Sequence, residues 1–212
     1  MSDEKSPHIV ENENGPLSAR HIDTMVGSDG AEIDTKPNMS LCRCGRSKDK
    51  PFCDGTHREA GFLSRSEKEP SGKDKLYQFE GNGVTVHYNP RVCSHAAQCI
   101  ARAPDAFDPD RRPWIKPENA DPAVIEAAVR ACPSGALMLE TKGDAQQLLP
   151  GRAQITVEKN GPYWVEGASI DVDLPGEGAT RDKYVLCRCG LSGNKPYCDG
   201  SHAGANWKDD NS

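Results

Sequence analysis

Alternating apolar and polar positions predict a strand near the middle of the chain. Val84, Val86 and Tyr88 alternate with polar residues, which is the period-2 pattern of a half-buried strand. His87 falls on the polar side of this alternation, so we expect it to be exposed. A second apolar run at residues 136–140 predicts another short strand.

Two short helices are predicted between these strands. The pattern over residues 94–103 favours a helix that ends before Pro104, because proline cannot continue a helix. A second helix begins at Asp121 and Pro122, with Asp as the N-cap and Pro at the first helical position. It is expected to end at Cys132, where a Pro-Ser-Gly sequence follows.

Polar segments separate the patterned parts of the chain. Residues 58–75 and 141–153 carry few apolar side chains and are predicted to be linkers. The two tails, residues 1–8 and 206–212, are expected to fray because chain ends are poorly ordered unless something holds them. The chain therefore divides into three patterned regions.

The composition indicates that a large hydrophobic core is not the main source of stability. Only 34 of the 212 residues are Leu, Ile, Val or Phe, a low share for a globular domain. The net charge of -6 is too small for a disordered chain of this length. Twenty Gly and 16 Pro imply many turns, and the nine Cys are the obvious alternative source of stability. Because metal binding contributes folding free energy, we expect the metal-free chain to be largely disordered.

Several classes of protein are excluded at this stage. No segment approaches the ~20 apolar residues of a membrane-spanning helix, and the acidic, polar start is unlike a secretory signal. An isoelectric point near 5.5 argues against a nucleic-acid partner. We therefore expect a cytoplasmic protein that contacts neither membrane nor nucleic acid. In a reducing compartment, patterned cysteines bind metal or do redox chemistry more often than they form disulfides.

The cysteines form three groups of three, and the outer two groups belong to an internal repeat. Residues 41–57 read LCRCGRSKDKPFCDGTH, and residues 186–202 read LCRCGLSGNKPYCDGSH. The Asn-Gly-Pro sequence at residues 14–16 returns at residues 160–162, so the repeat extends upstream of the cysteines. A module of roughly 45–50 residues is therefore present twice.

Each copy of the repeat supplies four candidate metal ligands in the pattern C-x-C-x8-C-x3-H. Two cysteines separated by a single residue can bind one iron. A Cys and a His four positions apart would share one face of a helical turn and can bind a second iron. Three thiolates and one imidazole match the four terminal ligands of a 2Fe-2S cluster. A structural zinc site with the same donors is the alternative. The candidate ligands are Cys42, Cys44, Cys53 and His57 in the first copy and Cys187, Cys189, Cys198 and His202 in the second.

The residues that follow each third cysteine also have expected structural roles. Asp54 and Asp199 lie where a helical turn begins and can cap its free amides. Pro51 and Pro196 precede the third cysteine of each copy and would set the direction in which the chain enters the loop. Both copies thus carry the same supporting residues as well as the same ligands.

These two segments resemble the CDGSH iron-sulfur domain of the mitoNEET type. The resemblance implies a small β-rich fold in which three Cys and one His hold a redox-active 2Fe-2S cluster, with the His as the solvent-facing, labile ligand. It also implies that two such units pair about a two-fold axis. Two copies in one chain would form that pair internally, as a pseudo-dimer within a monomer. Thr56 replaces the Ser of the motif and keeps its hydroxyl.

Basic residues crowd both outer motifs, and they have two interpretations. They form a solvated face, or they offset the charge of a cluster and help to dock an acidic partner. The residues are Arg43, Arg46, Lys48, Lys50, Arg188 and Lys195.

The middle cysteines have a different pattern. Cys93 and Cys99 are spaced C-x5-C, and Cys132 is followed by proline, so the segment resembles the divergent monocluster ferredoxin domains. Three thiolates suit a 3Fe-4S cluster, or a 4Fe-4S cluster that takes a fourth ligand from elsewhere. His95 is the nearest spare ligand, with Asp or water as alternatives; it either binds the cluster directly, supports the ligands from beside them, or lies on the surface.

Together these patterns predict an α+β protein of three modules. We define the first outer module as residues 9–60, the middle module as residues 76–141 and the second outer module as residues 154–206. We expect the outer modules to pack together as two small β-rich CDGSH units, with the ferredoxin-like module docked beside them.

The function expected from the sequence is electron transfer, with two 2Fe-2S clusters and one 3Fe-4S or 4Fe-4S cluster. We find no pair of nucleophile and base in the sequence, so we do not expect an enzyme. A carrier of iron-sulfur clusters, a redox or pH sensor, and a structural zinc protein remain alternatives. The expected partner is a redox protein, either a reductase or an acceptor, or an apo iron-sulfur protein that receives a cluster.

Overall fold

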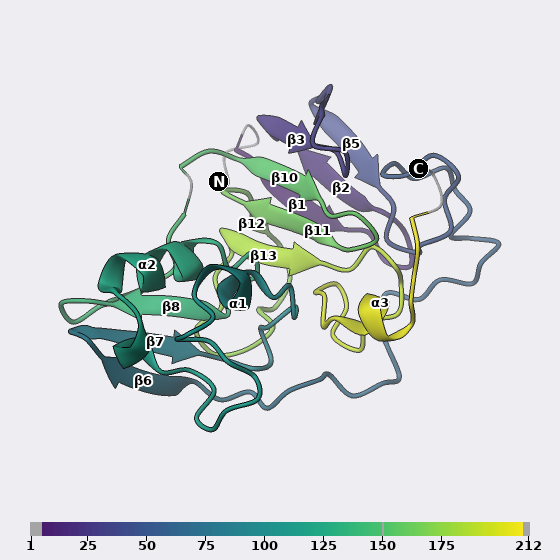
Figure 1. Cartoon of the computed structure of the whole chain (residues 1–212). Coiled ribbons are helices and arrows are strands. Elements are labelled where there is room, and N and C mark those ends of the chain that lie inside the picture. Colours follow the sequence, from purple (N-terminus) through teal and green to yellow (C-terminus); the bar gives the residue numbers. More distant parts are fainter. Residues whose placement is uncertain (1–5, 150, 210–212) are drawn as a thin grey trace.

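The computed structural model describes residues 6–149 and 151–209 as three sheets with a few short helices (Figure 1). In the first outer module the strands are β1 (His8–Glu11), β2 (Leu17–Arg20), β3 (Thr24–Val26), β4 (Glu32–Ile33) and β5 (Asn38–Leu41). The middle module contains β6 (Tyr77–Gly81), β7 (Val84–Tyr88), α1 (Gln98–Arg102), a 3-10 turn (Pro117–Asn119), α2 (Pro122–Arg130), β8 (Leu137–Glu140) and β9 (Ala145–Gln146). The second outer module contains β10 (Gln154–Val157), β11 (Tyr163–Glu166), β12 (Ser169–Ile170), β13 (Lys183–Leu186) and α3 (Ser201–Gly204).

The two outer modules exchange strands and so form one body. One sheet has the order β12-β1-β2-β5, and the other has the order β13-β11-β10-β3-β4. In the first sheet, β12 of the second module runs parallel to β1, with Ser169 opposite His8. In the second sheet, β3 of the first module runs parallel to β10, with Thr24 opposite Gln154. Each module therefore completes the other's sheet, which confirms the internal pairing of the two repeats.

The paired sheets enclose a single core. Short strands from one copy could not bury enough apolar surface alone, so the copies share it. Its buried members come from both modules and are Ile9, Leu17, Ala19, Ile22, Met25, Met39, Leu41, Ile155, Val157, Tyr163, Val165, Ala168, Ile170, Tyr184, Leu186 and Tyr197.

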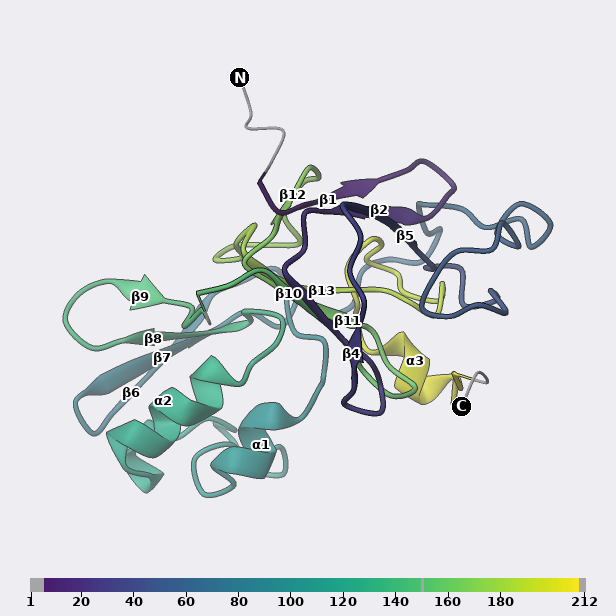
Figure 2. The ribbon, with the colours of Figure 1, turned by 90° about the horizontal axis from the view of Figure 1, so that it is seen from above.

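The middle module is an antiparallel sheet covered by two helices (Figure 2). Its strand order is β6-β7-β8-β9, which confirms the predicted strands at residues 84–88 and 136–140. The apolar face of α2 buries Ile125, Ala128 and Val129 in a second core. The other predicted helix is shorter than expected, because α1 begins only at Gln98. No helix in the described part of the chain is long and apolar enough to cross a membrane.

The expectation that His87 is exposed is wrong. Its side chain is 4% exposed, and its Nε2 lies 2.7 Å from Glu140 Oε2. Strand β7 is paired on both sides, and Glu140 on β8 lies diagonally across from His87 on the same face. The apparent polar side of the strand is thus closed by a neighbouring side chain that the local alternation does not show.

The segments predicted as linkers and tails are more structured than expected. Residues 58–75 include Ser64, which is 3% exposed and hydrogen-bonded to the first outer module. Residues 141–153 include β9, which pairs with β8. The tails also contribute, because His8 opens β1 and Asp209 is buried. Residues 1–5 and 210–212 of the predicted tails lie outside the described residues.

Polar contacts dock the middle module on the second outer module. Lys183 of β13 is 1% exposed, and its Nζ donates to the carbonyls of Arg130 at 2.7 Å and Leu148 at 3.0 Å. The side-chain amide of Asn89 donates to the carbonyl of Glu177 at 2.9 Å. The fold is therefore α+β and rich in strands, with the middle module beside the paired outer modules, as predicted.

Candidate metal centres

The first outer motif gathers its four candidate ligands into two pairs. Cys42 follows directly on β5, and its Sγ lies 3.7 Å from Cys44 Sγ. Across the loop, Cys53 Sγ lies 3.3 Å from His57 Nδ1. The spacing correctly predicted that these two side chains meet, but they do not share a helical turn, because Gly55 between them has a φ of +92° and the turn begins only after it.

The second outer motif repeats this geometry. Cys187 follows β13, and its Sγ lies 3.7 Å from Cys189 Sγ, while Cys198 Sγ lies 3.5 Å from His202 Nδ1 at the start of α3. The main difference between the sites is solvent access, because Cys198 is 4% exposed whereas Cys53 is only half-buried.

Equivalent backbone bonds hold both loops in shape. The amides of Cys42 and Cys187 each donate to the carbonyl of the loop proline, Pro51 or Pro196, at 2.8 Å. Both prolines follow cis peptide bonds. The two hydrogen bonds tie the first cysteine of each loop to the proline two positions before the third cysteine.

The aspartate after each third cysteine closes the loop as expected. Asp54 accepts the amide of Thr56 at 3.0 Å and that of Lys48 at 2.9 Å. Asp199 accepts the amides of Ser201 at 3.0 Å and Gly193 at 2.9 Å. The hydrogen bonds from the amides of Lys48 and Thr56 hold the pKa of Asp54 below its usual value. Each aspartate thus fastens the start of the helical turn to the middle of its loop.

Electrostatics at the paired thiols favour binding of a cation. The hydrogen bond from the Cys44 thiol lowers the pKa of Cys42 to about 6, and it raises the pKa of Cys44 in turn. The same interaction in the second site lowers the pKa of Cys187 to about 7 and raises that of Cys189. Each pair therefore holds one thiolate readily and a second only with a compensating positive charge, which a metal supplies.

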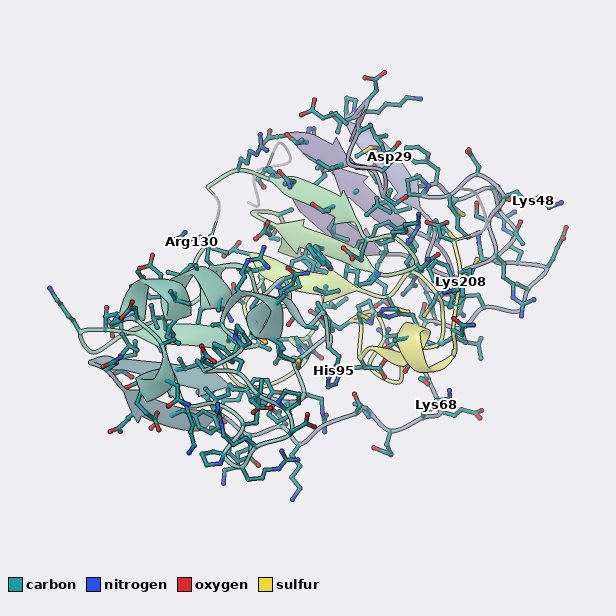
Figure 3. All side chains as sticks on the ribbon, viewed as in Figure 1. Asp29, Lys48, Lys68, His95, Arg130 and Lys208 are labelled. Atoms are coloured by element: carbon teal, nitrogen blue, oxygen red, sulfur yellow. The ribbon has the colours of Figure 1, made fainter. Side chains whose placement is uncertain are left out.

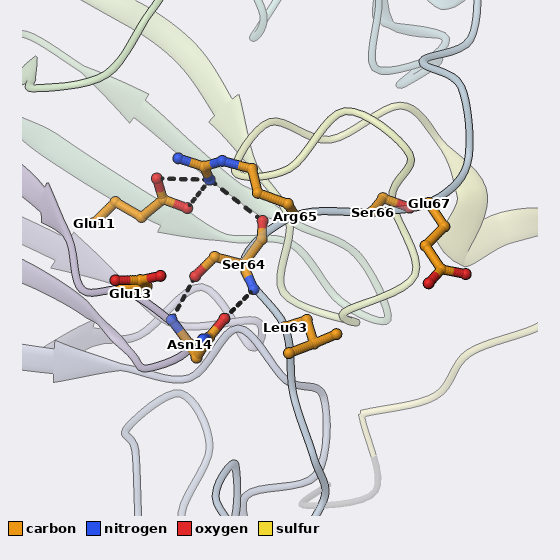
Figure 4. Close-up of a pocket in the computed structure, with 8 residues that line it drawn as sticks. All are labelled: Glu11, Glu13, Asn14, Leu63, Ser64, Arg65, Ser66 and Glu67. Carbon is orange, nitrogen blue, oxygen red and sulfur yellow. Dashed lines mark hydrogen bonds and ion pairs between the residues drawn. The ribbon is translucent and has the colours of Figure 1, made fainter.

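A buried arginine, Arg43, anchors the first loop. The interpretation of the basic residues around the outer motifs as a solvated face therefore does not hold for Arg43. Arg43 is 2% exposed, and its guanidinium donates to Glu11 Oε1 at 2.5 Å, to Ser64 Oγ at 2.6 Å and to two backbone carbonyls. Arg65 also donates to Glu11, at 2.7 Å. Figure 4 shows this region, where Ser64 exchanges two hydrogen bonds with Asn14.

Arg188 has the equivalent position in the second loop. It is 1% exposed, it donates to the carbonyls of Gly161 and Glu158, and its counter-ion is Asp209. The ring of Trp207 lies 5.0 Å from the guanidinium carbon, as the ring of Phe62 does from that of Arg43. The segment after each histidine thus folds back over the arginine of its own motif. The carboxylate partner lies before the motif in the first copy, as Glu11, and after the motif in the second, as Asp209.

The two Cys-x-Cys loops pack against each other where the modules meet. A Cβ on Gly45 would lie 2.5 Å from the carbonyl oxygen of Cys189, and a Cβ on Gly190 would lie 3.0 Å from that of Cys44. Both glycines have positive φ, +76° and +81°, a conformation and a spacing that only glycine fits easily. One ligand-bearing backbone of each outer site is therefore in direct contact with the other.

The middle cysteines meet in one pocket. Cys93, Cys99 and Cys132 line a cavity that Tyr88 and Trp114 also border. Burial raises the pKa of Cys93 to about 11 and that of Cys99 to about 12, and the nearby Cys132 thiol adds to both shifts. Three cysteines around one largely buried cavity suit a cationic iron-sulfur core.

His95 lies outside this pocket. It is exposed, and its imidazole packs toward Gly200, where an added Cβ would lie 3.0 Å from His95 Cδ2. Figure 3 shows His95 on the side of the middle module that faces α3. Gly200 separates Cys198 from His202, so the loop of the middle site touches the loop of the second outer site. The electrostatic influence of Cys93 on the pKa of Cys198 has the same origin.

Several residues that shape the sites had no signal in the local sequence. The hydroxyl of Tyr163 in β11 donates to the carbonyls of Cys42 at 2.8 Å and Pro51 at 2.9 Å, across the interface between the modules. Glu11 and Asp209 supply the counter-ions of the buried arginines. The repeated arginine inside both Cys-x-Cys sequences was the one available hint that such partners exist.

Comparison with known proteins supports this division of the chain. A family profile described as an iron-binding zinc finger of CDGSH type matches residues 7–58 and 160–203, and a profile described as a divergent 4Fe-4S mono-cluster matches residues 79–142. The uncharacterized protein YjdI of Escherichia coli, from strains K12 and O157:H7, is 33% identical to this chain over 64 residues. That alignment spans 30% of this chain and 84% of YjdI.

Proposed function

Because the chain belongs to the CDGSH iron-binding and the divergent 4Fe-4S mono-cluster families, we propose that it is an electron-transfer protein with three clusters. Each outer site would hold a 2Fe-2S cluster through three Cys and one His, and the middle site would hold a 3Fe-4S or 4Fe-4S cluster through three Cys. When bound, these clusters supply reversible one-electron redox chemistry. The proposal assigns no catalytic step to the chain, and turnover of a substrate by the purified protein alone would contradict it.

The observation that carries this proposal is the contact between the three ligand loops. The loop of the middle site touches the second outer site at Gly200, and the second outer site touches the first through Gly45 and Gly190. A protein that only stored or delivered separate clusters would not need such contacts. They place the ligand loops in an unbroken series from the middle module to the first outer module.

The arrangement of the donors favours two-iron clusters over zinc in the outer sites. Tetrahedral zinc would draw all four side chains to one ion. Each outer motif instead presents one Cys-Cys pair and one Cys-His pair, which suits two irons bridged by sulfide.

Anaerobic purification followed by iron, sulfide and zinc analysis tests the proposal. We expect about two irons per outer motif and about three or four more from the middle site, together with paramagnetic resonance signals on reduction. A colourless protein that contains zinc and no sulfide would refute it. Single Cys→Ser variants at Cys44, Cys189 and Cys99 would then show which signal belongs to which site.

Cluster delivery or redox sensing is the second candidate function, and the half-buried Cys53–His57 pair favours it. A ligand pair near the surface can release its metal more easily than the pair of the second site, in which Cys198 is buried. Mixing the loaded protein with an apo-ferredoxin, and separately with a reductase, distinguishes the two functions. Cluster transfer that is faster than electron exchange would favour delivery over electron transfer.

A further inference from the structure

Ser94 presents an unpaired hydroxyl at the middle site. Ser94 is 3% exposed and lines the same pocket as Cys93, Cys99 and Cys132. Its Oγ has no hydrogen-bond partner among the described residues. A buried hydroxyl without a partner is destabilising, so the chain gains from a group that this oxygen can contact within the pocket.

The other hydroxyls of the pocket already have partners. Ser134 Oγ accepts the amide of Ala136 at 3.4 Å, and the hydroxyl of Tyr88 is hydrogen-bonded to Cys93. Ser94 is therefore the lining residue of the pocket whose oxygen is left for a bound group.

The loop geometry separates Ser94 from its neighbour His95. His95 has φ of +56°, and its backbone amide donates to Cys93 Sγ at 3.4 Å. This turn brings the amide to the sulfur and directs the imidazole out toward Gly200. Of the two adjacent candidates, the serine is the one that lines the pocket of the three cysteines.

We propose that the middle site would hold a 4Fe-4S cluster and that Ser94 Oγ, and not His95, would be its fourth ligand beside the three thiolates. This inference rests on the proposed assignment of a cluster to the pocket. It adds an oxygen donor to the three thiolates and predicts that the site is sensitive to the residue at position 94 rather than to the residue at position 95.

Paramagnetic resonance of the intact, loaded protein tests this assignment. Ser94→Cys is expected to give a 4Fe-4S signal with four thiolates, and Ser94→Ala is expected to change the middle-site signal. His95→Ala, the matched control from the same loop, should leave the signal unchanged. The outer-site signals report in each variant that the protein has folded.

The result that overturns the assignment is a middle-site signal that neither Ser94 variant changes, or one that only His95→Ala changes. Failure of the proposed function would look different. It would appear as about four irons in the unmodified chain, which the outer sites alone account for, instead of about seven or eight.

A cleft over the contact between the two outer sites carries a second, independent inference. It has a volume of about 670 Å³, and Cys44 and Cys189 lie in its lining. The segments that fold back over the buried arginines form its walls, through residues 60–63, 65–68 and 207–208. One ligand of each outer site thus lies beside a single open cleft.

The cleft is basic, although the chain is acidic. Five Lys or Arg residues line it, and Glu67 is the single acidic lining residue in the described part of the chain. This local excess contrasts with the net charge of -6. Lys68 and Lys208, both marked in Figure 3, are exposed and in no ion pair among the described residues. The basic lining residues are Arg46, Arg65, Lys68, Lys195 and Lys208.

Exposed apolar side chains lie among these charges. Leu63 is 58% exposed and Leu191 is 37% exposed, and both line the cleft. A basic rim around apolar anchors is typical of a protein interface, whereas a site for a small anion would enclose its charges more fully.

We propose that this cleft docks an acidic redox protein. Its position beside Cys44 and Cys189 would bring that partner close to both outer sites. The inference depends on the proposed function only in taking the partner to be a redox protein. Positive charge at the docking surface would steer an acidic partner and would make binding sensitive to salt.

Binding of an acidic plant-type ferredoxin, used as the probe, tests the proposal without any electron transfer. The double variant Lys68→Glu/Lys208→Glu is expected to weaken binding about tenfold or more at low ionic strength, and high salt should weaken binding to the unmodified protein. Lys36→Glu/Lys142→Glu changes the net charge equally at exposed positions outside the cleft, and it should weaken binding less than about threefold.

Equal weakening by both double variants would overturn the proposal, because net charge alone would then explain it. Binding that does not respond to salt would also overturn it. Displacement of the ferredoxin by millimolar ATP would identify the cleft as a small-anion site instead. Failure of reversible reduction would refute electron transfer but leave this binding result intact.

Discussion

Replacing Arg43 tests whether the buried arginines hold the ligand loops in place. Arg43 is 2% exposed and donates hydrogen bonds to Glu11, Ser64 and two backbone carbonyls. Arg43→Met keeps most of the side-chain volume but removes the charge and the donors. Breaking a buried ion pair by deleting one partner costs about 3–5 kcal/mol. Arg65 still binds Glu11 in the variant, so we expect a loss near the lower end, about 3 kcal/mol.

The expected loss of stability in Arg43→Met can be measured as a faster loss of clusters from the loaded protein. If the loss appears mainly in the opening rate, about 3 kcal/mol accelerates opening by roughly a hundredfold. The assay follows visible absorption at a fixed urea concentration under anaerobic conditions. Arg46→Met is the matched control, because Arg46 lies in the same loop but is exposed, and exposed substitutions usually change stability by less than about 0.5 kcal/mol. Cluster loss at similar rates in the two variants would refute the anchoring role.

Three further outcomes are expected. Burial raises the pKa of Glu11, but the hydrogen bonds from Arg65 and Arg43 outweigh burial and bring the pKa below its usual 4.5. The stability that Glu11→Gln removes should therefore be present above pH 4.5 and vanish as the pH falls through the lowered pKa. A difference between the urea midpoints of the two proteins that widens in acid would contradict this. Gly45→Ala should lower the urea midpoint more than Gly30→Ala, because both have positive φ but only Gly45 faces the Cys189 carbonyl; equal shifts would show that the contact has no energetic role. Removing iron with a chelator should abolish cooperative melting followed by circular dichroism, as the sequence predicts, and a native-like spectrum without iron would show that the two apolar cores suffice.

The ligand sets could be predicted from the sequence because their donors are close together in the chain. The spacing of Cys42, Cys44, Cys53 and His57 already implied two pairs, and the same spacing returned 145 residues later. The strand at residues 84–88 and the helix that begins at Pro122 followed from equally local signals. In each case the residues that carry the pattern lie in one short, continuous segment of the chain.

The remaining features depend on contacts between distant segments, which a local pattern does not encode. Nothing in strands of two to four residues indicates that β3 pairs with β10 or β1 with β12. Arg43 and Arg46 look alike in a charged stretch, and only the distant Glu11 and Ser64 distinguish the buried arginine from the exposed one. His87 was misplaced for the same reason, since Glu140 covers it from another strand.

The strand exchange between the outer modules has a consequence for how the two halves can change. A homodimer made of two identical chains must accept every substitution twice, and it separates on dilution. Here the halves are covalently joined, so the assembly stays intact at any concentration and each half mutates independently. That independence explains how one half can carry Glu11 and a half-buried cysteine while the other uses Asp209 and turns its loop toward a neighbouring domain. Joining the two repeats in one chain thus allows the two outer sites to differ in their counter-ions and in their exposure to solvent.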